Sequence, residues 1–238
     1  MEYCYVCLGN GKRLGGECPL CNGLGFIGKI SREGLVDFIS HEAEKAGFNI
    51  FLQDSEKTSV NGIECSAFFD PNLKVLAVAR QNDNFFENLI HEFCHLRQYK
   101  IGCDAWNDSF VEGIDSSDIL DGFLNNQITL SDDNLQKLIT RIIEMEWDCE
   151  SRVKEYLVNV EGYSQESLNI YDMNAFMYMR FYRAVQYFKK WHLPNKDFLA
   201  MRIHQSYVDE VVNKYGRMPK YNDALLPEEI NLFRRCFE

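Results

Sequence analysis

Residues 83–100 read DNFFENLIHEFCHLRQYK, and this stretch contains the motif from which the fold and the candidate site are inferred. At about 100° per residue, His91 and His95 fall on one face of a helix, with the apolar residues on the other. Two imidazoles at this spacing can reach one metal ion, and Glu92 stands where it can take a proton from water. The pattern predicts an amphipathic helix with His91 and His95 as zinc ligands and Glu92 as the general base.

A catalytic zinc ion takes three protein ligands and keeps one position open for water, so a third ligand is expected elsewhere. The predicted helix 131–160 offers two acidic pairs, Glu144 with Asp148 and Glu146 with Glu150. Both pairs have i, i+4 spacing, so spacing alone does not choose between them. Helical phase does, because it puts Glu146 and Glu150 inside the apolar stripe and the other pair on the solvated side.

Two carboxylates in an apolar face are costly unless a cation or a hydrogen-bond donor compensates them. We therefore expect Glu146 to be the third zinc ligand, with Glu150 as an alternate ligand or as the hydrogen-bond partner of a ligand. The competing interpretation is that these acids pair with core arginines such as Arg180.

A second zinc site is predicted at the N-terminus, where C-x-x-C-x-G-x-G occurs twice, over residues 4–11 and 18–25. Two such turns supply the four sulfurs of a tetrahedral site. Four protein ligands leave no open position, so this zinc would be structural. The expected ligands are Cys4, Cys7, Cys18 and Cys21.

These motifs resemble known families. His91-Glu92-x-x-His95 with a downstream helical glutamate is similar to the gluzincin group of zinc metallopeptidases. The blocks 91–98 and 146–150, with Trp106, resemble small metallopeptidases encoded by bacteriophages. The doubled cysteine motif resembles the cysteine-rich region of DnaJ-type chaperones. These resemblances imply a zinc ligand set of His91, His95 and a carboxylate from Glu146 or Glu150, with Glu92 as the base.

Composition bounds the remaining possibilities. The chain has 238 residues, 46% of them hydrophobic, and a formal net charge of -11. That charge makes nucleic acid an unlikely partner, because phosphate binding needs a basic surface. The sequence has neither a secretory signal nor an apolar run long enough to cross a bilayer, and nine cysteines suit metal ligands and buried thiols in a reducing cytoplasm. We expect a cytoplasmic protein without membrane partners; its oligomeric state is not readable.

The expected fold class is α+β, mostly helical, with a small antiparallel sheet packed on the helix 83–100. The expected domains are a zinc ribbon (1–28), a zincin-like core (29–162) and a helical extension (163–238). Short apolar runs predict the strands, and Leu73–Ala79 is a candidate edge strand for pairing with an extended substrate.

The predicted function is a zinc-dependent metalloendopeptidase that hydrolyses polypeptides through a zinc-activated water. One alternative is a catalytically silent zinc-binding protein, possibly phage-encoded, that acts on a host partner. A second alternative is a metal-dependent hydrolase of another bond. The residues that would stabilise the oxyanion are not assigned, although Tyr99, Tyr178 and Tyr182 are candidates.

Overall fold

The computed structural model describes residues 2–3, 12–13, 16–17, 24–60, 63–193 and 205–238. By packing, the chain forms two compact units, residues 1–102 with 149–168 and residues 103–148 with 169–238. Helices α5 (Asp132–Leu157) and α6 (Gln165–Phe188) each contribute residues to both units. These units are defined by packing rather than by chain order. They therefore differ from the domains expected from the sequence, which were 1–28, 29–162 and 163–238.

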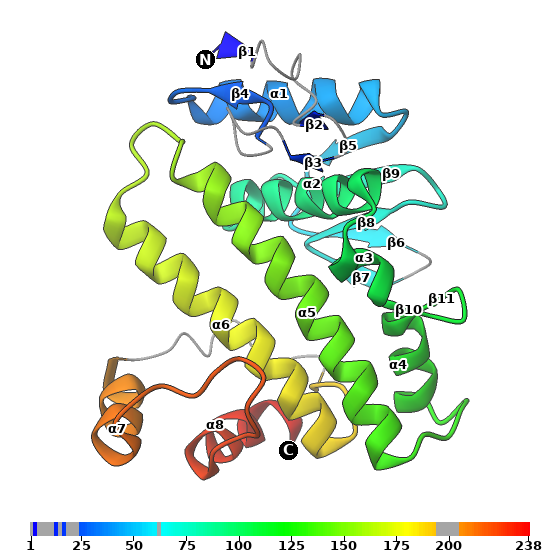
Figure 1. Cartoon of the computed structure of the whole chain (residues 1–238), viewed down its shortest axis with the longest axis vertical. Helices are drawn as coiled ribbons and strands as arrows, with labels where there is room; N and C mark the ends of the chain where they lie inside the picture. Colours follow the sequence, from blue (N-terminus) through cyan, green and yellow to red (C-terminus); the bar gives the residue numbers. More distant parts are fainter. Residues whose placement is uncertain (1, 4–11, 14–15, 18–23, 61–62, 194–204) are drawn as a thin grey trace. The chain divides into compact units, whose positions relative to one another are not determined.

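The first unit contains a three-stranded sheet in the order β5-β9-β8 (Figure 1). Its strands are β5 (Asn49–Gln53), β8 (Ala67–Asp70) and β9 (Val75–Ala79). β8 and β9 form an antiparallel pair, joined by a turn in which Asp70 Oδ1 accepts hydrogen bonds from the backbone N–H of Asn72 and Leu73. A second hairpin, β6 (Thr58–Val60) and β7 (Ile63–Cys65), lies between β5 and β8 in the chain.

Two expectations about this sheet are wrong. β5 and β9 run parallel, because residues 54–74 form a long crossover that returns the chain in its original direction. The sheet is therefore mixed rather than antiparallel. β9, which lies within the predicted edge strand Leu73–Ala79, is the central strand, and both of its edges are already paired.

Helix α1 (Arg32–Lys45) begins at Ser31, whose Oγ accepts a hydrogen bond from Gly34 N. Helix α2 (Phe85–Ile101) matches the helix predicted over residues 83–100 and packs against β8 and β9. Its apolar side enters the core, where the Phe93 ring contacts Phe38 and Tyr156. This packing leaves the opposite side of α2 for the two histidines.

In the described part of the second unit, the one pair of strands is a short hairpin, β10 (Phe110–Val111) with β11 (Ile114–Asp115), and the other elements are helices. Besides its parts of α5 and α6, it contains α3 (Asp104–Asp108), α4 (Ser116–Leu124), α7 (Gln205–Tyr215) and α8 (Pro227–Phe237). Its core joins apolar residues of α4, α5, α6 and α8, including Leu120, Ile142, Val185 and Phe233.

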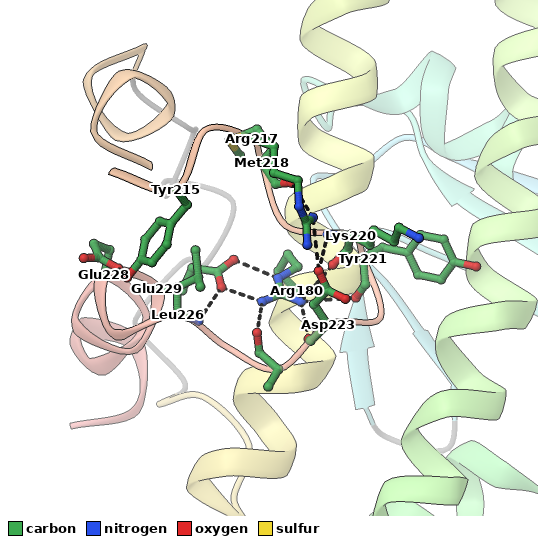
Figure 2. Close-up of polar contacts among 11 residues, drawn as sticks. Arg180, Tyr215, Arg217, Met218, Lys220, Tyr221, Asp223, Leu226, Glu228 and Glu229 are labelled. Carbon is green, nitrogen blue, oxygen red and sulfur yellow. Dashed lines mark hydrogen bonds and ion pairs between the residues drawn. The ribbon is translucent and has the colours of Figure 1, made fainter. Parts of the chain in front are cut away.

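A buried ion pair holds α8 on α6. Arg180 and Glu229 are both fully buried, and Arg180 Nε donates to Glu229 Oε1 over 2.7 Å (Figure 2). The same guanidinium donates to the backbone carbonyls of Lys220, Tyr221, Asp223 and Ala224. Arg180 is thus the anchor for the loop that leads into α8.

The remaining described strands are pairs of two residues each near the N-terminus. β1 (Glu2–Tyr3) pairs with β4 (Phe26–Ile27), and β2 (Lys12–Arg13) pairs with β3 (Gly16–Glu17). The predicted zinc ligands Cys4, Cys7, Cys18 and Cys21 lie outside the described residues. Among the residues that are described, no helix has the length and hydropathy needed to cross a bilayer.

The structure confirms the mostly helical α+β class with a small sheet.

Candidate metal centre

Helix α2 brings His91 and His95 together as the i, i+4 spacing predicts. The Nε2 atoms of the two rings lie 3.0 Å apart, and the rings meet at 82° with centroids 4.6 Å apart. His95 is buried at 7% exposure, and the His91 side chain is 15% exposed. The pair therefore lies at the edge of the interior of the first unit.

Polar contacts at the Nδ1 atoms indicate which nitrogen each ring offers to a metal. His95 Nδ1 lies 2.8 Å from Gln98 Oε1, and His91 Nδ1 lies 3.2 Å from Glu150 Oε1. An amide oxygen and a carboxylate oxygen can only accept, so these contacts favour a proton on each Nδ1. Each neutral ring then offers a lone pair at Nε2.

This arrangement fits a metal ion. Two lone pairs 3.0 Å apart repel unless a cation lies between them, and a direct Nε2–H···Nε2 bond would require one ring to be doubly protonated. Tetrahedral zinc with Zn–N bonds near 2.0–2.1 Å separates its two nitrogens by about 3.3 Å. The two rings need to move apart by only a few tenths of an ångström to accept the ion.

The sequence left two roles open for Glu150, as an alternate zinc ligand or as the partner of a ligand. Its carboxylate, 11% exposed, contacts Nδ1 of His91, the nitrogen that points away from the Nε2 pair. A carboxylate in this position orients the ring and makes Nε2 more basic. In this structure Glu150 is therefore the partner of a candidate ligand.

Glu146 lies one helical turn before Glu150 on α5 and is buried at 6% exposure. Glu144 is exposed, so the expectation that phase turns Glu146 inward is confirmed. In the second unit, burial and then the Glu146 charge raise the pKa of Tyr182, whose hydroxyl lies 3.0 Å from that of Tyr178. The ligand role of Glu146 itself stays a prediction.

The alternative in which Arg180 neutralises the inward-facing acids does not occur. The Arg180 guanidinium donates to Glu229 and to the loop carbonyls. Glu150 instead meets an imidazole.

Cys149 is a neighbour of the site that the sequence motifs do not identify. It is fully buried, its thiol donates to the His91 carbonyl over 3.4 Å, and its Sγ lies 3.7 Å from His91 Nδ1. His91, His95 and Cys149 each offer a ligand atom within 4.8 Å of the others. Because Sγ approaches the Nδ1 edge of His91, beside Glu150, we assign Cys149 to the surroundings of the site rather than to its ligands.

Glu92 is half-buried and lies close to the end of β7. Burial raises the pKa of the Cys65 thiol to about 11, and the nearby Glu92 carboxylate is the second cause of this rise. Glu92 follows His91 directly on α2, next to the histidine pair in sequence. A carboxylate there can exchange a proton with water.

Comparison with protein-family models, with curated proteins and with solved structures gives no match to this chain.

Proposed function

We propose that the chain is a zinc-dependent peptidase whose centre is built on His91, His95 and Glu92. The observation that carries the proposal is the pair of Nε2 atoms 3.0 Å apart, each ring being oriented by an acceptor at its Nδ1. Rings held in this way need only a small shift to bind a metal. The substrate class that we propose is polypeptide, in keeping with the resemblance to gluzincins.

The proposed ligands are His91, His95 and the Glu146 carboxylate. When bound, zinc polarises the substrate carbonyl and brings the pKa of water toward neutrality. Glu92 then accepts the proton of the attacking water and returns it to the leaving amine nitrogen. Glu150 keeps the His91 imidazole in the orientation that this chemistry needs.

Replacing Glu92 tests the peptidase proposal. Glu92→Gln keeps the shape of the side chain and removes the base, so cleavage of a peptide library should fall by about 10²–10⁴-fold while zinc content is unchanged. Glu44→Gln, an exposed position on α1, is the matched control and should cleave as the wild type does. Equal cleavage by Glu92→Gln would contradict the role of the base.

A wild-type protein that holds zinc at the histidines but cleaves no peptide would point to the alternative of a silent zinc-binding interaction protein. Cleavage of a non-peptide amide alone would point to a different hydrolase.

Zinc content tests the third ligand. Glu146→Gln should lose the zinc that His91→Ala also loses, because two imidazoles alone hold zinc weakly. Glu144→Gln, on the solvated side of the same helix, should keep it. Retention in both glutamine variants, with loss in Cys149→Ala, would move the third ligand from Glu146 to Cys149.

The four N-terminal cysteines are proposed to hold a second, structural zinc, which gives two zinc ions per chain. Zinc measured in the His91→Ala variant should therefore fall from two to one, and the remaining ion reports the cysteine site.

A further inference from the structure

Gln98 is a buried polar residue beside the candidate site, and no sequence motif predicts a role for it. Its side chain is fully buried, and its Oε1 lies 2.8 Å from His95 Nδ1. The two residues are three positions apart on α2, so one helix carries both the imidazole and the group that orients it. A buried amide is retained only where hydrogen bonds compensate its desolvation.

The chemistry of the amide fixes the tautomer of His95. Because Oε1 has no proton to give, the 2.8 Å contact requires a proton on Nδ1. The lone pair of His95 is thereby directed at the Nε2 of His91 before any metal arrives. A side chain without an acceptor at this position would leave the ring free to exchange its proton between both nitrogens.

We infer that Gln98 is a positioning residue that holds His95 in its metal-binding tautomer and orientation. The inference rests on the proposed function, and it adds a part of the site that the HExxH motif does not contain. The two imidazoles then have different partners, a carboxylate at His91 and a neutral amide at His95. The neutral partner orients its ring without adding a further negative charge to a site that already contains Glu92 and Glu150.

Two substitutions separate positioning from packing. Gln98→Met keeps the length of the side chain and removes the acceptor, whereas Gln98→Glu keeps an acceptor oxygen. Zinc affinity, measured by competition with a chelator, should fall by about 10–100-fold in Gln98→Met and should match or exceed the wild type in Gln98→Glu. Gln53→Met, at an exposed position of β5, makes the same chemical change away from the site and should have no effect.

The tautomer gives a readout that does not depend on activity or on zinc. In the metal-free protein, ¹⁵N resonances of His95 should report a proton on Nδ1 in the wild type and in Gln98→Glu, and a mixture of tautomers in Gln98→Met. Thermal unfolding of each variant establishes that it is folded before either measurement is interpreted.

The outcomes are distinguishable. Wild-type zinc affinity and an unchanged His95 tautomer in folded Gln98→Met would overturn the role of Gln98 and leave the zinc site intact. Equal zinc content in the wild type and in His91→Ala would instead overturn the proposed metal centre. A loss of zinc affinity in Gln98→Glu as large as in Gln98→Met would assign Gln98 to packing and overturn the inference as well.

Discussion

The thiol of Cys65 connects the hairpin of the first unit to the candidate base. Burial raises its pKa first, and the negative charge of Glu92 raises it further, to about 11. Both effects disfavour the thiolate, which is the reactive form of cysteine. Cys65 is therefore a local reporter of the charge on residue 92.

The reporter gives a prediction at the scale of one residue. Glu92→Gln removes a negative charge that favours the thiol, so the pKa of Cys65 should fall and the thiolate fraction at a fixed pH should rise. Alkylation of Cys65 by iodoacetamide in metal-free protein, followed by mass spectrometry of its peptide, should be several-fold faster than in the wild type. Glu64→Gln, next to Cys65 in sequence but paired with Lys57, should leave the rate unchanged. An unchanged rate in Glu92→Gln would mean that the carboxylate is remote from the thiol.

At the scale of the element, helix α2 ends at a glycine, Gly102. Gly102 adopts a left-handed conformation with φ of 61°, and its N–H donates to the carbonyls of Gln98 and Tyr99. This conformation is unfavourable for residues with a Cβ atom. The ending matters for the site, because the last turns of α2 contain His95 and Gln98.

Two alanine substitutions should act in opposite directions. Gly102→Ala should lower the free energy of unfolding by about 1 kcal/mol, because alanine at positive φ is strained. Gly122→Ala, inside α4, should raise it by about 0.5–1 kcal/mol, because its new Cβ would lie 3.6 Å from Ile128, an ordinary contact. Urea unfolding of both variants measures the difference. Destabilisation of equal size in both would show that the backbone conformation is not the cause.

At the scale of the whole molecule, the chain is organised by long-range pairing as well as by local pattern. In the second unit, Arg180 binds Glu229, forty-nine residues later, and Glu229 also accepts from the Leu226 N–H at the start of α8. The Glu229 charge further raises the pKa of Tyr207 on α7, after burial as the larger cause. One buried ion pair thus connects α6 with α8, and its charge acts on a tyrosine of α7.

Breaking this pair should cost far more than breaking an exposed one. Arg180→Met leaves the Glu229 charge buried without its partner, so the free energy of unfolding should fall by about 3–5 kcal/mol. Arg217→Met removes an arginine that is 64% exposed and pairs with Asp223 in the same loop, and should change stability by about 0–1 kcal/mol. Chemical denaturation compares the two variants. A similar small effect for both would show that the Arg180 network does not hold α8.

Much of the site could be predicted because it depends on one helix at a time. The spacing of His91 and His95 is enough to place two rings on one face, since helical geometry fixes their separation. Phase along α5 likewise predicts that Glu146 turns inward and Glu144 outward, and the burial of these side chains agrees. The antiparallel sheet is the expectation that failed, because pairing across residues 54–74 leaves no local signal.

By itself the sequence determined the two helices that carry the candidate site, their faces and the residue types proposed to bind a metal. Only the tertiary structure decided that Glu150 meets His91, that Cys149 lies beside the same ring, and that Arg180 serves Glu229 rather than the acids of α5. The physical reason is the separation in sequence over which each kind of interaction acts. Helical periodicity is set by hydrogen bonds between residues four apart, whereas partners such as Glu150 and Glu229 are chosen by side-chain packing between segments distant in the chain.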